Sequence, residues 1–395
     1  MSVSYWLDQN KGKKEIRTDI AIIGGGITGI SLAYWLDKLG GAKVTLIERG
    51  RMASGATGRN AGFLISGMAE NHFRMWNRHG PETAKLLHSL TAENHRLIED
   101  ELIKKKQIDC GFSRRGSVTS AITDEEFIEL EKSYNLLLKD GFECKLLRTE
   151  INEKLKTEGL RGGILNPADG SLNPVRLVAG IADTLSDDIA IIDRCEVFDI
   201  SNDSGDILIR SERMNVRCDM AVAAVNAYAP TIIPKLKGEV SPTRGQLLAT
   251  APIEEKLFDG HAVYCDFGYE YFRQLDDGTL LMGGFRQHYR ADELGYSDET
   301  TDNIQKGLER FIAGHIPAAS GKKITHRWSG VMGFTTDGLP IVGEIPSTPG
   351  LMFIGGYTGH GLAFAFILAK ALAEQLINGK TQYPLDLFSI RRLLV

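Results

Sequence analysis

Apolar residues follow two periods along the chain, and both appear within the first fifty positions. Residues 19–23 and 44–47 are short apolar runs with the composition of buried strands. Residues 30–39 have the spacing of an amphipathic helix, and the glycine-rich residues 24–29 form a turn before it. The pattern predicts a β-α-β unit near the start of the chain.

Three later segments share helical spacing and charged faces: 81–106, 124–139 and 298–312. Three strands are expected before the last of these segments: 246–250, 262–275 and 279–285. Asp276-Asp277-Gly278 is a hairpin turn that joins the last two strands. The chain then returns to an apolar strand at 351–354 and a helix that begins near Gly361. Because the sequence has no internal repeat, low-complexity segment or linker, we expect two domains to be interleaved.

The composition is that of a globular protein with a large core. The chain has 395 residues, of which 43% are hydrophobic and 25% charged, which is enough for two domains. Its net charge of -5 arises from acidic and basic residues mixed along the sequence, with only short basic clusters such as Lys104-Lys105-Lys106. Nucleic-acid binding requires a focused basic face, so no nucleic-acid partner is expected.

No feature of the sequence indicates export or a membrane span. Residues 1–17 are polar and lack the apolar core of a signal peptide. The five cysteines are scattered and form no C-x-x-C pair, so neither a zinc site nor a disulfide framework is expected, and a reducing cytoplasm fits best. The apolar stretch 361–377 contains Lys370, Glu374 and Gln375 and is shorter than the roughly 20 apolar residues of a span. It predicts a buried helix.

The β-α-β unit carries the signature of a dinucleotide site. Gly24-x-Gly26-x-x-Gly29 permits a tight turn, close approach of backbone to a pyrophosphate, and close helix–strand packing. Glu48, at the end of the second strand, can accept hydrogen bonds from both ribose hydroxyls of an adenosine, and a carboxylate there disfavours the 2′-phosphate of NADP. Singly, the glycines would fit an ordinary loop and Glu48 an exposed strand end. Their joint spacing indicates a nucleotide.

A run of small residues follows at 53–63, Ala-Ser-Gly-Ala-Thr-Gly-Arg-Asn-Ala-Gly-Phe. Such a run lets backbone pass close to a bulky planar ligand while its N–H groups and hydroxyls meet phosphate and ring polar atoms. This loop favours FAD over NAD as the dinucleotide.

At these residues the sequence resembles the D-amino-acid-oxidase-like superfamily of FAD oxidoreductases, which includes glycine oxidase, sarcosine oxidase and gamma-glutamylputrescine oxidase. The resemblance runs from Asp19 to about Asn378. The matching segments are Gly24-Gly25-Gly26-Ile27-Thr28-Gly29, Glu48-Arg49, 55–62, 170–174, Val225-Asn226-Ala227-Tyr228, Arg244-Gly245-Gln246, Trp328-Ser329-Gly330, 337–343 and 355–361. Arg59-Asn60, Tyr271-Phe272-Arg273 and 356–361 look most like the gamma-glutamylputrescine oxidase group.

The resemblance implies an α/β fold in which a Rossmann-type, glutathione-reductase-like FAD-binding domain is interleaved with an antiparallel-sheet substrate domain. We expect the first at 16–105, 160–232 and 327–395, and the second at 106–159 and 233–326. The pyrophosphate would lie on Gly24, Gly26, Ile27, Thr28 and Gly29, and the adenosine ribose on Glu48 and Arg49. The small-residue run would contact the phosphates and the flavin through Ala56, Thr57, Gly58, Arg59, Asn60, Ala61, Gly62 and Phe63. Val197 would contact adenine, and the isoalloxazine would meet Gly356, Tyr357, Thr358, Gly359, His360, Gly361 and Leu362.

The helix that begins near Gly361 has a physical reason to point at the N1–C2=O edge of the flavin. Hydride arriving at N5 leaves negative charge near N1, and a helix N-terminus offers free N–H groups and about half a positive charge. His360 would add a donor there or be structural; the sequence leaves both open.

Two departures from the family pattern narrow the expectation. In amino-acid oxidases of this superfamily an arginine just after the Trp-x-Gly segment clamps the substrate carboxylate, whereas Met332 stands there in this chain. This favours an amine or an N-substituted compound over a simple α-amino acid. No cysteine follows Cys265, and Arg59-Asn60 occupies the loop where some relatives attach FAD through histidine, so FAD is expected to be non-covalent.

On the substrate side, alternation in the predicted hairpin puts Tyr269, Tyr271 and Arg273 on one face. Tyr271, Arg273 and His360 are therefore the candidate catalytic residues. The alternative is an aromatic face packed on the core with Arg273 reaching to water. Arg286 and His288 are further candidates, or surface residues after the strand.

The reaction we expect is hydride transfer from the α-carbon of a neutral amine to flavin N5, giving an imine that water hydrolyses. The electron acceptor is either oxygen or a carrier such as a quinone. Competing readings are a flavin-binding module without amine chemistry and the oxidase part of a tRNA-modifying enzyme.

Overall fold

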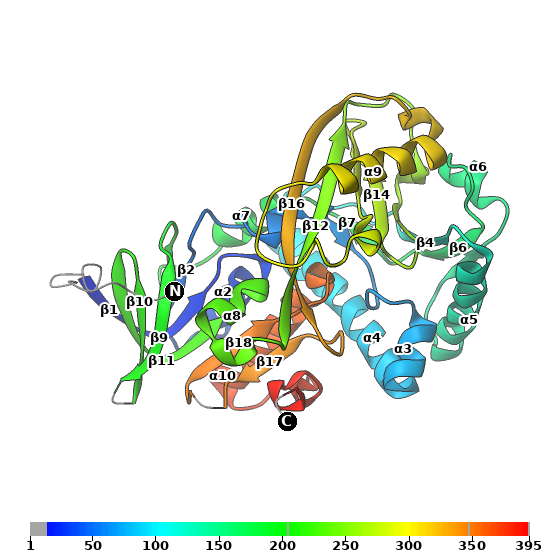
Figure 1. Ribbon diagram of the computed structural model, residues 1–395. Coiled ribbons are helices and arrows are strands. Elements are labelled where there is room, and N and C mark those ends of the chain that lie inside the picture. Colours follow the sequence, from blue (N-terminus) through cyan, green and yellow to red (C-terminus); the bar gives the residue numbers. More distant parts are fainter. Residues whose placement is uncertain (1–13, 204, 347, 394–395) are drawn as a thin grey trace.

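The computed structural model describes residues 14–203, 205–346 and 348–393, which form two large sheets and the helices around them (Figure 1). Residues 1–13, which include most of the polar stretch expected not to be a signal peptide, lie outside the described residues. The mixed α/β architecture agrees with the fold class expected from the sequence.

The first sheet is built around parallel strands. Its order is β17-β18-β11-β1-β2-β8, with β10 and β9 extending from β11. The strands are β1 Lys14–Ile23, β2 Val44–Ile47, β8 Ile189–Ile192, β9 Val197–Asp203, β10 Asp206–Ser211, β11 Met214–Ala223, β17 Ile341–Glu344 and β18 Leu351–Gly355. Ile22 at the centre pairs with Leu46 on one side and Val222 on the other, and all three are fully buried. Continuous apolar runs of this kind suit strands covered on both faces.

Helices α2 (Ile27–Leu39) and α10 (Gly361–Asn378) pack together against this sheet, and α4 (Pro81–Leu97) packs on α10 (Figure 1). The indole of Trp35 in α2 donates to the carbonyl of Phe366 in α10 at 3.0 Å. Helix α10 is long and apolar enough to cross a membrane by composition alone, but core helices pass the same test. Its buried residues belong to the largest core cluster, as expected from the sequence.

The second sheet is largely antiparallel, in the order β16-β12-β15-β14-β13-β4-β6-β5, and only β13 and β4 pair in parallel. The strands are β4 Ser117–Ala121, β5 Lys145–Leu147, β6 Gly162–Asn166, β12 Val240–Thr250, β13 Ala262–Cys265, β14 Glu270–Gln274, β15 Leu280–Gly283 and β16 Ile324–Thr335. Figure 1 shows the long strands β12 and β16 side by side, running from the region of β17 and β18 up to helix α9.

The remaining elements surround these sheets. The helices are α3 His72–His79, the π-helical segment η2 Ile98–Lys105 that continues α4, α5 Asp124–Asp140, α6 Ile151–Leu155, α7 Pro174–Ala182, α8 Ala229–Ile232 and α9 Asp302–His315. A short ribbon pairs β3 (Phe63–Leu64) with β7 (Gly170–Ser171). All five cysteines are buried free thiols.

Three predicted boundaries are corrected. Helix α2 begins at Ile27, inside the predicted glycine turn, because the hydroxyl of Thr57 accepts the Ile27 N–H at 3.0 Å. Helix α9 begins at Asp302 instead of 298, because Thr301 is extended and donates its N–H to Gln246 Oε1 at 2.9 Å. The run 262–275 is two strands, because the chain reverses through positive φ at 266–268.

Strands β6 and β16 bear on the expected domain limits. Both belong to the second sheet, although residues 160–232 and 327–395 were expected to form the FAD-binding domain. A division that follows the sheets would move these limits to the ends of the two strands.

Candidate active site

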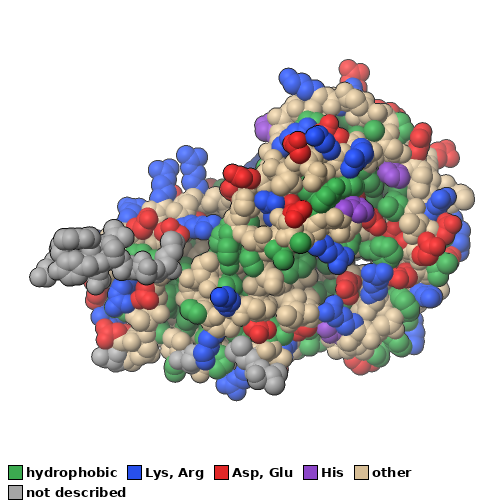
Figure 2. Space-filling view, viewed as in Figure 1, with side chains coloured by type: hydrophobic (Ala, Val, Ile, Leu, Met, Phe, Trp, Pro, Cys, Tyr) green, Lys and Arg blue, Asp and Glu red, His purple; other side chains and the backbone are tan. Residues whose placement is uncertain are grey.

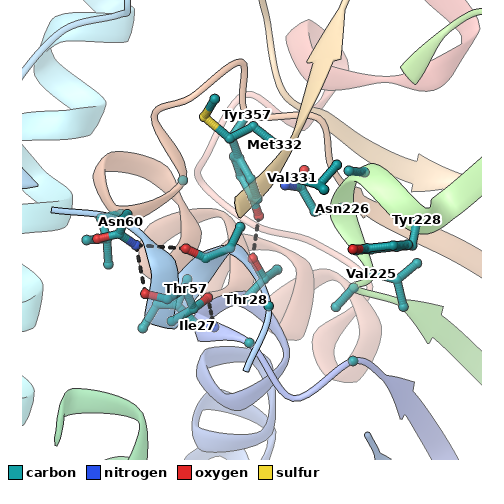
Figure 3. Close-up of a pocket in the computed structure, with 18 of the residues that line it drawn as sticks. Ile27, Thr28, Thr57, Asn60, Val225, Asn226, Tyr228, Val331, Met332 and Tyr357 are labelled. Atoms are coloured by element: carbon teal, nitrogen blue, oxygen red, sulfur yellow. Dashed lines mark hydrogen bonds between the residues drawn. The ribbon is translucent and has the colours of Figure 1, made fainter. Parts of the chain in front are cut away.

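One large cavity lies where the carboxyl ends of the parallel strands β1, β2 and β11 meet strands β13, β14 and β16 of the second sheet (Figure 3). Ligands of open α/β sheets bind outside the carboxyl ends of the strands. The lining residues come from loops after β1, β2, β8 and β11, from the small-residue run, from the second sheet and from the start of α10.

The N-terminus of α2 opens onto one wall of the cavity. Gly26 is the helix cap, and Gly26, Ile27 and Thr28 line the wall. A Cβ on Gly26 would lie 3.0 Å from the Thr57 hydroxyl, so only glycine leaves this wall open. Gly29 does not line the cavity; a Cβ there would lie 1.8 Å from the Gly24 carbonyl, so Gly29 permits the close helix–strand packing expected of it.

Glu48 stands at the end of β2 with a fixed carboxylate. One oxygen accepts the Gly25 N–H at 2.6 Å and the other accepts the Gly50 N–H at 2.7 Å. Both oxygens keep lone pairs for further donors. Val197 lines the cavity at this end, as expected. The Arg49 guanidinium lies 3.8 Å from the centroid of the Tyr228 ring, and both residues line the cavity.

The small-residue run forms the short helix η1 (Ala56–Arg59) and then a turn in which Gly62 has a φ of 74°. Asn60 donates to the carbonyls of Ala56 and Thr57 at 3.2 and 2.8 Å, and its Oδ1 accepts the Gly62 N–H at 2.7 Å. These bonds fix the backbone around the cavity (Figure 3).

Part of the run supports the wall instead of lining it. The lining residues are Ser54, Gly55, Ala56, Thr57, Asn60, Ala61 and Phe63. Gly58, Arg59 and Gly62 lie behind them. The Arg59 guanidinium donates to the Ser329 carbonyl at 2.8 Å, which ties the run to β16.

The N-terminus of α10 opens onto the opposite part of the cavity. Tyr357, Thr358, Gly359, His360, Gly361 and Leu362 line it, whereas Gly356 lies behind and donates its N–H to Asn226 Oδ1 at 2.9 Å. The phenol of Tyr357 bonds with the Thr28 hydroxyl at 3.0 Å, which joins the two helix starts (Figure 3). Buried Asn94 of α4 bonds with the Leu362 carbonyl and the Ile367 N–H, so the start of α10 is held in place.

The end of the cavity formed by the second sheet is aromatic. Phe63 packs edge-on against Tyr264 and Tyr271, with ring centroids 5.3 and 6.1 Å away. The His360 ring is stacked at 6.0 Å from that of Tyr264. Met332 on β16 lines the same end, where the sequence predicted a side chain that cannot bind a carboxylate.

Most titratable groups at this end are neutral near pH 8. Burial raises the pKa of Tyr271 to about 12, and it also raises the pKa of Tyr264. Burial, assisted by the charge of Arg286, lowers the pKa of His360 to about 4, so its imidazole is uncharged. The Nδ1 atom of His360 is buried and has no hydrogen-bond partner in the described part of the chain.

Arg273 shares the face of Tyr271, as the alternation predicted, but it does not line the cavity. Its guanidinium donates to the Gly62 carbonyl at 3.2 Å and to the Leu172 carbonyl at 3.5 Å, and burial lowers its pKa to about 10. The side chain is partly buried against these two carbonyls and is not among the residues that line the cavity, so its candidate catalytic role stays a prediction. Tyr269 precedes β14 and lies against Arg286 and Arg290.

Several lining residues were not predicted. Tyr264, Thr231 and Cys195 come from segments far apart in the chain, and no local pattern marks them; Asn226 lies in a segment that matches the family but was not assigned a role. Arg286 was a lesser candidate, and the structure places it in the cavity. His288 does not line the cavity.

The residues present fit FAD. Two helix N-termini and a glycine wall suit a pyrophosphate and a developing negative charge, and the Glu48 carboxylate suits ribose hydroxyls. Among the described residues, no cysteine lines the aromatic end, and non-covalent attachment of FAD stays a prediction.

Comparison with known proteins gives a consistent result. The family model for FAD dependent oxidoreductases, named DAO, matches residues 19–375. Gamma-glutamylputrescine oxidoreductase of Escherichia coli strain K12 is 26% identical over 377 residues, 92% of this chain and 84% of that protein. Glycine oxidase of Geobacillus kaustophilus strain HTA426 is 26% identical over 391 residues, 95% of this chain and 97% of that protein.

Solved structures share the fold along nearly the whole chain. L-proline dehydrogenase from P. horikoshii superposes with a TM-score of 0.82 at 21% identity, over 96% of this chain and 99% of that one. Glycine oxidase from Geobacillus kaustophilus gives a TM-score of 0.79 at 25% identity, over 95% of this chain and 98% of that one.

Proposed function

The chain belongs to the DAO family of FAD dependent oxidoreductases, and from this premise we propose that it oxidises the C–N bond of an amine or an N-substituted amino acid. The observation that carries the proposal is the aromatic end of the cavity, which Tyr264, Tyr271 and Met332 close next to the N-terminus of α10. The names of two relatives, gamma-glutamylputrescine oxidoreductase and glycine oxidase, support substrates of this kind.

We propose that FAD occupies the length of the cavity, with its adenosine at Glu48 and Val197 and its pyrophosphate on the start of α2. The isoalloxazine would then lie between the run at 56–63 and the start of α10. Bound there, FAD supplies a hydride acceptor for the substrate carbon next to nitrogen.

The protein's own part is to orient and desolvate the substrate. Buried Phe63 and the partly buried Tyr264 and Tyr271 form an aromatic wall that would keep water from the reacting carbon. The tyrosine hydroxyls stay protonated at physiological pH and can hydrogen-bond an amine without taking its proton. The uncharged His360 imidazole can do the same.

No side chain at this end is suited to deprotonate an alkylammonium ion. Among the described residues that line the aromatic end and the adjoining start of α10, the titratable groups are the phenols of Tyr264, Tyr271 and Tyr357, the imidazole of His360 and the guanidinium of Arg286. The imidazole has a pKa of about 4, far too low to act as a base toward an amine with a pKa near 10. We therefore propose that the neutral amine is the reacting form. The imine product leaves the aromatic end and is hydrolysed by water.

The domain division and the location remain proposals. We propose that the FAD-binding part follows the first sheet and the substrate part the second, and that the protein works in a reducing cytoplasm, where its free thiols would persist. Figure 2 shows basic and acidic side chains interspersed on one face, which is the charge pattern expected of an enzyme that does not bind tRNA.

The test is the absorbance spectrum of the purified protein, followed by anaerobic addition of glycine, sarcosine, proline and glutamylputrescine. Flavin bands that shift to free FAD on denaturation would support non-covalent binding. Bleaching by one class of compound would support amine oxidation and name the class. Bands that persist with every compound would contradict the proposed reaction while leaving FAD binding intact. Reoxidation with oxygen or with a quinone would then identify the acceptor.

A further inference from the structure

We propose that Arg286 forms an anion subsite at the aromatic end of the cavity, so that the oxidised amine carries a carboxylate. This inference rests on the proposed function, because it names the substrate class of the same site. Arg286 lines the cavity with Tyr264, Tyr271 and His360. Among the described residues, it is the only cationic side chain that lines this end.

The guanidinium of Arg286 forms no salt bridge with a carboxylate of the described residues, although its charge opposes the burial that raises the pKa of the neighbouring Glu270 carboxyl to about 8. Arg286 makes no hydrogen bond or salt bridge with any residue that the structure describes, although other arginines of the second sheet do. Arg244, for example, is paired with Glu293 at 2.7 Å. A partly buried guanidinium that faces a cavity without a partner is a site for a ligand carboxylate, because its planar fork of donors matches two carboxylate oxygens.

Two aromatic rings hold Arg286 without neutralising it. Its guanidinium carbon lies 4.7 Å from the ring centroid of Tyr269 and 5.3 Å from that of Phe334. Stacking on rings restrains the side chain, while the N–H groups at the edge of the fork stay available. The rings therefore preorganise a donor whose charge is still present for a substrate.

The backbone turns sharply to bring Arg286 to this place. Strand β15 ends at Gly283, and Gly284 and Phe285 follow with φ of 134° and 65°. A Cβ on Gly284 would lie 2.2 Å from the Tyr269 carbonyl, so the turn requires glycine. Phe285 adopts the left-handed region without being glycine, which costs of order 1 kcal/mol and persists only where the surroundings enforce it. Without this turn the chain would continue along the sheet past the cavity.

The positive field of Arg286 reaches the groups around the expected substrate. Its charge contributes to lowering the pKa of His360, and it opposes the burial that raises the pKa of Tyr264 and Tyr271. The same end contains Met332, which offers no charge. Met332 on β16 therefore cannot bind an anion, and the guanidinium of Arg286, on the turn after β15, is placed to do so.

The experiment compares matched pairs of substrates that differ only in the carboxylate. The pairs are proline with pyrrolidine, sarcosine with dimethylamine, and 4-(methylamino)butanoate with N-methylpropylamine. The variants are Arg286→Met, Arg286→Lys and, as control, Arg290→Met. Arg290 stacks on the same Tyr269 ring at 5.3 Å but does not line the cavity. Flavin content and thermal midpoint show whether each variant is folded.

We expect the wild-type protein to prefer at least one acid to its neutral partner. Arg286→Met should lower kcat/KM for that acid by at least about 30-fold and leave kcat/KM for the neutral amine within about threefold of the wild-type value. Removing the guanidinium affects only the substrate that carries a carboxylate to pair with it. Arg286→Lys should recover part of the loss, and Arg290→Met should match the wild type. Equal losses for acid and neutral partner, or no preference in the wild type, would overturn the proposal.

A binding measurement separates this inference from the proposed function. Benzoate and benzamide are titrated into the holoprotein, and the flavin spectrum reports their binding without any reaction. Benzoate should bind at least about 30-fold more weakly to Arg286→Met than to Arg290→Met, with benzamide unaffected. If no amine reduces the flavin but benzoate shows this dependence, the subsite stands and the oxidation fails. If amines reduce the flavin and benzoate binds both variants alike, the subsite fails alone.

Discussion

Replacing Glu48 with glutamine should weaken FAD binding without changing the chemistry. In the structure one carboxylate oxygen accepts the Gly25 N–H and the other accepts the Gly50 N–H. The amide of glutamine has a single acceptor oxygen, so its NH2 group must face one of these two N–H donors. The variant therefore loses a charge-assisted hydrogen bond and places two donors against each other.

The magnitude follows from these contacts. A hydrogen bond to a charged group contributes about 1.5–3 kcal/mol, and each 1.4 kcal/mol is a factor of ten in affinity. The ribose hydroxyls of FAD would lose the same charged acceptor. We expect the Kd for FAD to rise by about 10- to 100-fold. Because Glu48 lies at the opposite end from Tyr271, kcat at saturating FAD should stay within about threefold of the wild type.

The assay is a titration of apoprotein with FAD in which the quenching of flavin fluorescence reports binding. Glu48→Gln is compared with the control Glu143→Gln. Glu143 is exposed and does not line the cavity. A Kd for Glu48→Gln within threefold of the control would refute the assignment of this carboxylate to the cofactor. A large fall in kcat with FAD fully bound would refute its placement far from the reaction.

Four further predictions test other parts of the argument. With a methylated amine, kcat/KM should rise with pH toward the pKa of the amine. No ionisation of the enzyme should alter the profile between pH 6 and 9, because the pKa of His360 is about 4 and that of Tyr271 is about 12. A bell-shaped profile in this range would contradict the neutral-amine mechanism. Arg273→Met should cost about 1–3 kcal/mol of stability and weaken FAD retention, with kcat at saturating FAD nearly unchanged; a hundredfold loss of kcat in fully loaded enzyme would support a catalytic role for Arg273. Gly29→Ala should prevent accumulation of folded holoprotein, since its Cβ would lie 1.8 Å from the Gly24 carbonyl, whereas Gly314→Ala, with open space around it and far from the cavity lining, should be tolerated; equal yields would contradict the packing. His88→Gln should lessen the fall in thermal midpoint between pH 7 and pH 5: burial lowers the pKa of His88 to about 3, so the folded state loses stability as pH falls below about 6.5, by about 2 kcal/mol at pH 5, and an unchanged slope would show that His88 does not cause it.

The nucleotide end of the cavity could be predicted because several of the residues that form it lie close together in the sequence. Gly29 is required by a contact with Gly24 within one strand–turn–helix, and Glu48 follows the next strand of the same unit. Gly24 and Gly26 are also required by contacts with Ala224 and Thr57, which lie outside that strand–turn–helix. Even there, the start of α2 was placed three residues late. The Thr57 hydroxyl that takes the Ile27 N–H comes from a later loop, which no local pattern identifies.

The substrate end could not be predicted in the same way. Alternation correctly put Arg273 and Tyr271 on one face, but it does not say what covers each position along that face. Tyr271 faces the cavity, whereas Arg273 lies under the carbonyls of Gly62 and Leu172, two segments distant in sequence. Arg286 reaches the cavity only because Phe285 adopts a positive φ that its residue type does not favour.

With FAD and substrate bound as proposed, the cavity would place the cofactor contacts mainly on the first sheet and the substrate contacts on the second. The Glu48 carboxylate follows strand β2, and helix α2 starts at Ile27 just after strand β1. A shift of the backbone there would disturb the core that covers both faces of the parallel sheet. Arg286, the one cationic side chain among the described residues that line the aromatic end, lies on a turn of the second sheet. The rings of Tyr269 and Phe334 contact its guanidinium, and Gly284 permits the turn. Changes in the β13–β15 turns can therefore alter which amine is accepted while the affinity for FAD stays constant. On the proposed binding mode, substitutions in these turns would change substrate preference without changing the contacts expected to hold FAD.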